Sequence, residues 1–544
     1  MATSALGPQP TSLSMLPRRQ IFITLAGVML AMFLSSLDQT VVGTAMPRII
    51  ADLGGFSKYT WVTTAYIITS AVMVPITGKL IDMYGRKWFY IIGISIFLAG
   101  SLLCGFSQDM TELILFRGFQ GIGAGIMMAN AFTVVADLFS PAERGKYVGY
   151  MTGVFGLSSV IGPTIGGFLT DSISWHWVFW VNPPLGVIVI YLFVKYFPHI
   201  RPDNLKHTID FPGLTALILS VVPAMIALTW GGNEYPWKSP FIIGLFIFAA
   251  VMIFAFILIE RRAKEPIIPL SLFKNNIITV SIIATFLTSI GMFGAITFLP
   301  LFFQGIRGSS AIASGNLMIP MMVGVLAGSL TCGQLMARAG GHYRVLGIVG
   351  TAIMAVGLFL LSRMGVGTQY STSVIFMVIT GIGLGTTMPV FTIAVQNAVS
   401  QNQLGVATSA ASFFRSIGGS IGLAILGSVM SNRFGYYLMG QMPASLVAAV
   451  PPSQLSALAN NPQALVSPEA QAGLKQTVDQ LGQPGLFDQL LAGIRHALSS
   501  SISEVFLIGA IIVGFGLIAT FFLKEIPLRT HNRREPDAPA KPEK

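Results

Sequence analysis

The amino-acid sequence predicts an all-helical membrane protein with fourteen transmembrane helices, arranged as two six-helix bundles with two further helices inserted between them. Three observations lead to this fold class. Hydrophobic residues make up 53% of the 544 residues and charged residues only 10%, against about 25% charged in an ordinary globular protein. Apolar runs of about 20 residues, enough to cross hydrocarbon, recur along the chain, and its two halves resemble each other. The composition excludes a soluble multidomain enzyme and a disordered chain.

The apolar runs are bounded by charged or turn residues. They cover residues 21–46, 59–81, 88–107, 111–137, 145–170, 177–197, 211–231, 239–260, 276–303, 311–337, 343–363, 371–397, 403–430 and 503–523. An even number of spans places both termini on one side. Of the 32 Lys and Arg residues, 22 then fall on the side of the N-terminus, which the positive-inside rule identifies as the cytoplasm. The net charge of +11 is therefore a topology signal, and no nucleic-acid partner is expected.

An internal repeat divides the chain. The segment FLSSLDQTVVGTAMP (33–47) aligns with FLTSIGMFGAITFLP (286–300), and three further matches follow in the same order. The alignment pairs the first span with the ninth, so a six-span unit is used twice with spans seven and eight inserted. Parallel repeats of this kind predict two bundles that rock about a central site near the midplane. Asp38 aligns with Gly291, so charge chemistry is expected mainly in the first bundle.

These observations predict five segments. They are an N-terminal cytoplasmic tail (1–20), a first bundle (21–197), a linker with the two inserted helices (198–274), a second bundle (275–523) that includes an external loop (434–500), and a cytoplasmic C-terminal tail (524–544).

Three ionisable residues lie deep inside predicted spans, namely Asp38, Arg117 and Arg415. Such groups are costly in hydrocarbon and mark functional sites by default. Asp38 and Arg117 both lie roughly 9–12 Å below the outer membrane surface at 1.5 Å per residue, so they can pair. The pair is either a static structural contact or a proton-carrying site that switches when water or substrate arrives. Arg415 has no acid nearby in its own span, which leaves backbone carbonyls, water or an anionic substrate group as its partners.

Two short motifs carry further candidates. GKLIDMYGRK joins the second and third spans, where Gly78 and Gly85 permit a tight turn and close helix approach. Asp82 is expected to cap a helix N-terminus or to pair with a basic residue such as Arg86 or Lys87. The alternative is a basic loop that only sets topology.

The fifth span carries small residues and a proline, namely Gly156, Gly162, Pro163, Gly166 and Gly167. Small residues at these spacings allow close helix packing, and the proline removes one helix hydrogen bond. Ordinary packing is the alternative explanation.

Together these residues resemble a known family. LDQTVVGTAMPRI (37–49), GKLIDMYGRK (78–87), LILFRGFQGIGAG (113–125), the glycines of the fifth span and WHWVFWVNPPLG (175–186) are similar to motifs of the fourteen-span drug:H⁺ antiporter branch of the major facilitator superfamily. The resemblance covers about 21–523 and implies the major facilitator fold.

The resemblance implies multidrug efflux driven by protons, by alternating access and without enzymatic chemistry. It makes Asp38 the proton-coupling acid, with Arg117 influencing its protonation, and it makes Gly78, Asp82, Gly85, Arg86 and Lys87 the cytoplasmic gate. The fifth-span residues would be the antiporter motif that seals the resting state. We expect the substrate cavity to involve Gln39, Gln120, Met127, Asn130 and Arg415.

The expected partners are a small-molecule substrate, protons and the lipid bilayer, and the chain is expected to act as a monomer in a bacterial inner membrane. No organic cofactor or metal is expected, since no GxxxxGK[ST], HExxH or CxxC motif occurs. Several members of the family that export cations carry further acids in spans 2, 10 or 13, and here those spans have none deep inside. We therefore expect a neutral, monocationic or partly anionic amphiphile as substrate.

Two alternatives to drug export stay open. One is export of a specific endogenous lipid, amino acid or siderophore by the same fold, and the other is a receptor or scaffold that does not transport. For the external loop 434–500, in which Ser467, Pro468 and Glu469 read as a helix start, we expect one or two amphipathic helices on the membrane surface or over the exit, with a floppy connector as the alternative.

Overall fold

The computed structural model describes residues 17–54, 58–197, 208–232, 234–307, 317–338, 342–441 and 486–528. These residues form helices and connecting turns, and they contain no named strand. Fourteen of the helices are long and apolar enough to cross a membrane, which confirms the predicted number. The predicted helix start at Ser467, and most of both predicted tails, lie outside the described residues.

The helices of the first bundle are α1 (Arg18–Leu53), α2 (Tyr59–Tyr84), α3 (Arg86–Gly105), α4 (Met110–Leu138), α5 (Pro141–Ser172), and a sixth span made of α6 (Trp177–Trp180) and α7 (Asn182–Tyr196). Those of the second bundle are α10 (Asn276–Arg307), α12 (Ile319–Arg338), α13 (Tyr343–Leu361), α14 (Tyr370–Asn397), α15 (Leu404–Gln441) and α19 (Leu486–Phe521). Between them lie α8 (Phe211–Trp230) and α9 (Pro240–Glu260), and two short 3₁₀ helices, η3 (Leu270–Lys274) and η4 (Gln401–Gln403), precede α10 and α15.

Local sequence explains where several helices begin and end. Asp109 caps α4 by accepting hydrogen bonds from the backbone N–H groups of Thr111 and Glu112. A capping box of Ser140 and Glu143 begins α5, and such caps satisfy N–H groups that the helix leaves unpaired.

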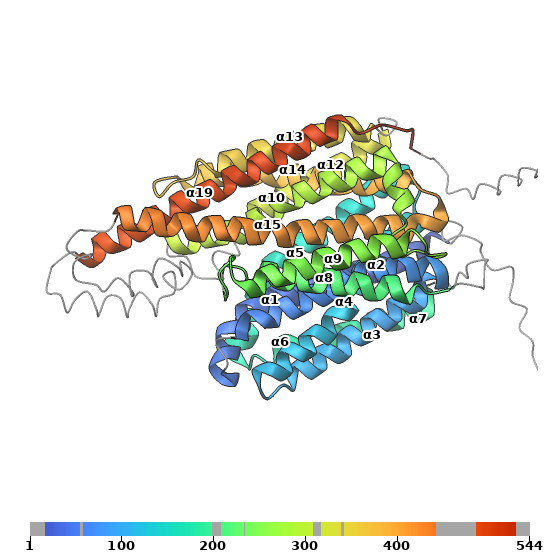
Figure 1. Ribbon diagram of the computed structural model, residues 1–544, viewed down its shortest axis with the longest axis horizontal. Helices are drawn as coiled ribbons and strands as arrows, with labels where there is room; N and C mark the ends of the chain where they lie inside the picture. The colour runs from blue at the N-terminus through green and yellow to red at the C-terminus, as the bar shows by residue number, and fades with distance from the viewer. Residues whose placement is uncertain are drawn as a thin grey trace, which may run out of the picture.

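The two bundles are packed in the same way. In the first, α4 packs against α2 and α3 while α1 packs against α5 and α7; in the second, α14 packs against α12 and α13 while α10 packs against α15 and α19. Helices that the sequence repeat pairs with each other thus have equivalent neighbours in the two bundles. The bundles lie one above the other with their helices running along the same direction (Figure 1), and the predicted fold class is confirmed.

The inserted helices lie against both bundles. α8 and α9 pack on each other, and α8 also packs against α2 of the first bundle and α15 of the second. Val72 of α2, Leu217 and Val221 of α8, Phe256 of α9 and Phe413 of α15 belong to one apolar cluster. The insertion therefore covers the line along which α2 and α15 meet.

The largest difference from expectation concerns the predicted external loop. α15 has 38 residues and α19 has 36, so at 1.5 Å per residue each is over about 50 Å long, against about 30 Å of hydrocarbon. Both project beyond the other helices at the left of Figure 1. The two helices thus extend through 434–441 and 486–500, beyond the span ends predicted at 430 and 503 and into the segment predicted as the external loop.

Side-chain packing explains these extensions. Phe434 and Leu438 of α15 pack in one cluster with Leu490 and Ile494 of α19. Glu504 receives a hydrogen bond from Tyr437 (2.5 Å) and pairs with Arg433 (2.6 Å between Oε2 and Nε). Each helix buries an apolar stripe against the other, so its polar residues remain on the outer face.

Candidate functional site

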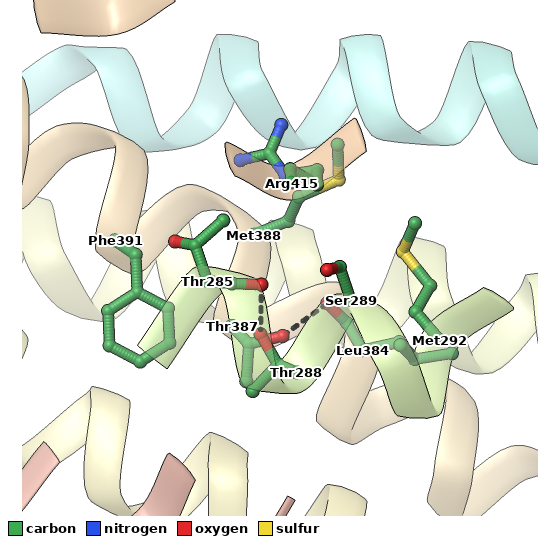
Figure 2. Close-up of a pocket in the computed structure, with 9 residues that line it drawn as sticks. All are labelled: Thr285, Thr288, Ser289, Met292, Leu384, Thr387, Met388, Phe391 and Arg415. Atoms are coloured by element: carbon green, nitrogen blue, oxygen red, sulfur yellow. Dashed lines mark hydrogen bonds between the residues drawn. The ribbon is translucent and has the colours of Figure 1, made fainter. Parts of the chain in front are cut away.

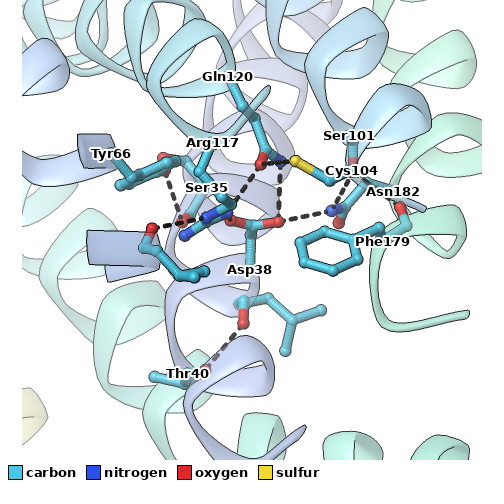
Figure 3. A network of polar contacts seen from close by, with 12 residues as sticks. Ser35, Asp38, Thr40, Tyr66, Ser101, Cys104, Arg117, Gln120, Phe179 and Asn182 are labelled. Atoms are coloured by element: carbon cyan, nitrogen blue, oxygen red, sulfur yellow. Dashed lines mark hydrogen bonds and ion pairs between the residues drawn. The ribbon is translucent and has the colours of Figure 1, made fainter. Parts of the chain in front are cut away.

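A buried ion pair lies inside the first bundle. Arg117 of α4 donates from Nη1 to Oδ2 of Asp38 on α1 over 2.5 Å, and the two side chains are 1% and 0% exposed. The two residues, which the sequence placed at a similar depth, are thus in direct contact, as Figure 3 shows. Because both charges are withdrawn from water, each depends on the other for compensation.

Two amide side chains complete the surroundings of the carboxylate. Gln120 and Asn182 each donate from their amide nitrogen to Oδ1 of Asp38 over 2.9 Å. Asn182 also donates to Oγ of Ser101 (2.9 Å), whose hydroxyl donates to the carbonyl oxygen of Phe179 (2.7 Å). Four spans, through α1, α3, α4 and the α6–α7 pair, therefore meet at one carboxylate (Figure 3).

The guanidinium of Arg117 is also held by neutral groups. It donates to Oε1 of Gln120 (2.7 Å) and to the carbonyl oxygen of Val62 (3.3 Å). Its Cζ lies 4.2 Å from the centre of the Tyr66 ring, a cation–π contact that stabilises a desolvated cation. The phenol of Tyr66 is in turn hydrogen-bonded to Ser35 (3.1 Å).

Sequence reasoning found the two charges of this network and Gln120, but missed its other neutral members. Asn182, Ser101 and Tyr66 are common residue types in spans and carry no pattern of their own. The one available signal was Asn182, a polar amide at the first residue of α7, inside the sixth span.

A second polar cluster joins the two bundles at the end where α4 leads to α5 and α14 leads to α15. The carboxylate of Asp82 on α2 accepts hydrogen bonds from the backbone N–H groups of Gly405 (3.1 Å) and Val406 (2.9 Å), the first turn of α15. Arg86 donates to the same carboxylate (3.0 Å), and its Nε lies 2.6 Å from Oδ2 of Asp137 on α4. Asp82 thus caps a helix and also pairs with an arginine, whereas Asp137 was not predicted.

Close backbone approach supports this contact, which we call the α2–α15 latch. A Cβ atom added at Gly78 would lie 1.7 Å from Oγ of Ser409 and 2.9 Å from the carbonyl oxygen of Gly405, so only glycine fits. Gly85 ends α2 with a φ of 91°, a conformation that favours glycine. Lys87 donates to the carbonyl oxygen of Val194 near the end of α7 (3.0 Å), so it binds its own bundle and does not cross to the other.

A second seam between the bundles runs along α5 and α12. A Cβ atom added at Gly145 would lie 2.7 Å from Cα of Gly333, so the two backbones touch. Further along the same pair of helices, Gly156 meets the side chain of Met322, whose sulfur is 3.1 Å from the position of an added Cβ. The sequence repeat pairs α2 with α12 and α5 with α15, so the α5–α12 seam and the α2–α15 latch are equivalent contacts. Together they close one end of the bundle interface.

The rest of the fifth-span motif faces α1. Added Cβ atoms at Gly162 and Gly166 would lie 1.9 Å and 2.1 Å from the hydroxyl oxygens of Thr40 and Thr44. Pro163 and Gly167 lie in the same stretch of α5 and are partly buried. The motif therefore packs α5 tightly against the helix that carries Asp38, one turn away from the carboxylate.

The residues expected to line a substrate cavity do not gather at one place. Gln120 belongs to the Asp38 network, and Met127 is fully buried in the apolar core of the first bundle. Gln39 is exposed, and Asn130 is buried with neither amide atom hydrogen-bonded to the described part of the chain. Of this group, Arg415 lines a pocket.

That pocket is small and partly open, and it lies among α10, α14 and α15. It is lined by Thr285, Thr288, Ser289, Met292, Leu384, Thr387, Met388, Phe391 and Arg415, as Figure 2 shows. Hydroxyl groups, apolar side chains and one cation thus share a small volume within the second bundle.

The described residues contain no group of three His, Cys, Asp or Glu side chains that could hold a metal ion. Cys104 and Cys332 are free and buried.

Comparisons with known proteins agree with this architecture. The profile described as Major Facilitator Superfamily matches residues 28–210 and 211–423. The chain is 43% identical to "Multidrug transporter protein MdtP" of Bacillus subtilis, over 96% of this chain and 95% of that protein. It is 38% identical to "Multidrug resistance protein 3" of the same organism, over 93% and 95%.

A solved structure, that of the human organic anion transporter MFSD10 (TETRAN), matches with a TM-score of 0.57 and 12% identity over 92% of this chain and all of the other. At that identity the likeness concerns the fold alone. The sequence relatives are transporters and not enzymes, and they support a role in membrane transport and efflux. This multi-pass membrane protein therefore belongs to the major facilitator superfamily.

Proposed function

We propose that the protein exports small hydrophobic or amphipathic compounds in exchange for protons, with Asp38 as the proton-coupling acid. The buried pair of Asp38 and Arg117 carries the proposal, because it places a titratable group inside the first bundle among four spans. The names of the two Bacillus subtilis relatives favour multidrug export over a single endogenous substrate.

Proton binding at Asp38 would change more than one contact. The ionised carboxylate accepts hydrogen bonds from Arg117, Gln120 and Asn182, and protonation removes the charge that attracts all three. A buried arginine left without its anion is strongly destabilising, by about 3–5 kcal/mol in comparable cases. The neutral carboxyl group and Arg117 therefore favour a different arrangement of α1 and α4.

The fifth-span glycines offer a route from this site to the bundle interface. α5 packs against α1 through Gly162 and Gly166, and against α12 of the second bundle through Gly145 and Gly156. A shift of α1 would thus reach the α5–α12 seam through the close contacts of α5. Alternating access then consists of opening this end, where the seam and the α2–α15 latch lie, while the opposite end closes.

The same proposal includes the setting of the protein. Both termini face the cytoplasm, the membrane is a bacterial inner membrane, the working unit is a monomer, and no metal or organic cofactor takes part. The positive-inside distribution supports this orientation, with 22 of the 32 Lys and Arg residues on the side of the termini.

Proton exchange by purified protein in liposomes tests the proposal. With an imposed pH gradient, we would follow lumenal pH on adding phenylnaphthylamine (neutral) or ethidium (cationic) to wild type, Asp38→Asn and Asp109→Asn. Asp109 is a matched control, because it is an exposed carboxylate whose hydrogen bonds stay within the first turn of α4. Wild type and Asp109→Asn should release protons on addition of a compound, and Asp38→Asn should not.

Other outcomes would change the assignment. Equal proton release by all three proteins shows that another group carries the proton. Compound transport without any proton release refutes coupling while leaving export in place. If no compound is moved by wild type, the proposal of multidrug export fails, and a specific lipid, amino acid or siderophore becomes the better substrate class.

A further inference from the structure

Arg415 differs from other arginines of the spans in its partners. Arg117 pairs with Asp38, Arg86 pairs with two aspartates, and Arg144 donates to backbone carbonyl oxygens at 2.6 Å and 3.0 Å. Among the described residues, Arg415 has one hydrogen-bond partner, the hydroxyl of Thr392 at 3.2 Å, and no carboxylate within ion-pair distance. A guanidinium carries five donors, so most of its hydrogen-bonding capacity is free.

The position of Arg415 makes this lack of an anion costly. It lies in the middle of a span, partly buried, and its Cζ is 5.9 Å from the ring of Phe132 on α4 of the first bundle. An aromatic face at that distance compensates only a small part of a desolvated positive charge. A cation in such a place is retained where it serves a function, and it favours an anion entering from outside the chain.

The pocket beside Arg415 suits the head of an amphiphile. The hydroxyl groups of Thr288, Ser289 and Thr387 donate to carbonyl oxygens of their own helices, and Arg415 is the one charged donor among the residues that line the pocket. No acidic side chain lines it, and Met292, Met388 and Phe391 supply apolar surface. The pocket is small and partly open, so the part of a ligand that reaches Arg415 would be its charged group, with the rest of the molecule outside the pocket.

We propose that Arg415 binds the negative charge of the transported compound, so that amphiphiles with one carboxylate or sulfonate group are a substrate class of this protein. The charged group occupies the pocket beside Arg415, and the apolar body lies against the methionines and Phe391. This inference rests on the proposed export function and narrows its substrate class. It also separates the two charges of the transport cycle, with the proton at Asp38 in the first bundle and the substrate anion in the second.

A matched pair of fluorescent compounds tests the inference. Anilinonaphthalene sulfonate and phenylnaphthylamine share one aromatic skeleton and differ by the sulfonate. Binding of each would be measured to protein in phosphatidylcholine nanodiscs, with protein-free nanodiscs subtracted. The variants are Arg415→Gln, Arg415→Lys and, as a control on the same helix, Arg433→Gln, whose arginine pairs with Glu504 away from the pocket.

Arg415→Gln should weaken sulfonate binding about tenfold to one-hundredfold, the effect of losing a hydrogen bond to a charged group, and leave the neutral compound within about threefold. Arg415→Lys should recover part of the loss because it keeps the charge without the planar fork. Arg433→Gln should bind both compounds like wild type. In proteoliposomes, wild type should move the sulfonate and Arg415→Gln should move it more slowly.

Three results would overturn the inference. Equal effects of Arg415→Gln on both compounds, or no effect on either, make Arg415 a structural residue. If phosphatidylglycerol in the nanodiscs lowers the sulfonate affinity of wild type but not of Arg415→Gln, the site binds a lipid headgroup. Wild type that moves the neutral compound but neither binds nor moves the sulfonate refutes this inference alone, whereas failure to move either compound refutes the export function beneath it.

Discussion

Replacing Asp82 by asparagine should release the end of the bundle interface that the structure shows closed. The carboxylate joins the bundles by accepting hydrogen bonds from Gly405 and Val406 at the start of α15, while Arg86 of its own bundle holds it in place. An asparagine of the same shape keeps one acceptor oxygen and loses the charge. Wild type should therefore keep this end closed for a larger fraction of the time than the variant does.

The magnitude follows from the contacts that are lost. A hydrogen bond to a charged group contributes about 1.5–3 kcal/mol, and a carboxylate at a helix N-terminus adds up to about 2 kcal/mol where partly buried. These contributions overlap, so we expect a shift of about 2–4 kcal/mol toward the open state, which corresponds to roughly 30-fold to 1,000-fold in the equilibrium.

Cysteine labelling measures that shift. Gly78 covers Ser409 in the closed α2–α15 latch. Ser409 would be changed to cysteine after the two natural cysteines are replaced by alanine, and the rate of its reaction with a maleimide would be followed. Asp82→Asn should speed labelling by roughly 30-fold to 1,000-fold. The increase levels off if the open state becomes the predominant one. Asp109→Asn, which alters an equivalent cap within one bundle, should leave the rate within about threefold. A folded Asp82→Asn protein that labels at the wild-type rate would refute the role given to this carboxylate.

Three further predictions concern stability and packing. Arg117→Gln should lower the free energy of unfolding, measured by denaturant titration, by about 3–5 kcal/mol because it leaves Asp38 buried without a cation. Adding Asp38→Asn should restore part of this loss, and a double variant as unstable as the single one would contradict the prediction. Gly145→Val should disrupt the α5–α12 seam, where a Cβ already comes within 2.7 Å of Gly333, and abolish transport, whereas Gly43→Val, with open space around it, should keep transport activity. Glu504→Gln should cost no more than about 1 kcal/mol in thermal unfolding because its ion pair with Arg433 is partly exposed to solvent, and a larger loss would make the projecting helices essential to the fold.

The fold class followed from the sequence because its causes are local in the chain. Hydropathy alone placed fourteen spans, and the repeat predicted two equivalent bundles, in which α4 and α14 have equivalent neighbours. The predicted ends of the last two spans were too short, because α15 and α19 each continue without a break into a projecting part. Asp488, Arg495 and His496 interrupt the apolar pattern of α19, and a hydropathy average cannot show that one face of this stretch packs against α15.

The candidate site was predictable in part for a similar reason. A charge inside an apolar run is conspicuous, so Asp38, Arg117 and Arg415 stood out, and the rise per residue placed the first two at one depth. Asp82 was expected either to cap a helix or to pair with a basic residue, and it does both. Asn182 carries no charge and Asp137 lies at the very end of its predicted span, so neither stood out in this way.

The sequence by itself determined where charge enters the membrane-spanning region, because the cost of burying a charge depends on the composition of the surrounding run. Tertiary structure alone decided how each charge is compensated. Asp38 is surrounded by donors up to 144 residues away, Asp82 caps a helix 323 residues away, and Arg415 faces a pocket with a single hydroxyl partner among the described residues. Hydrogen bonds act over about 3 Å, and contacts of that range are set by the packing of distant helices and not by neighbours in sequence.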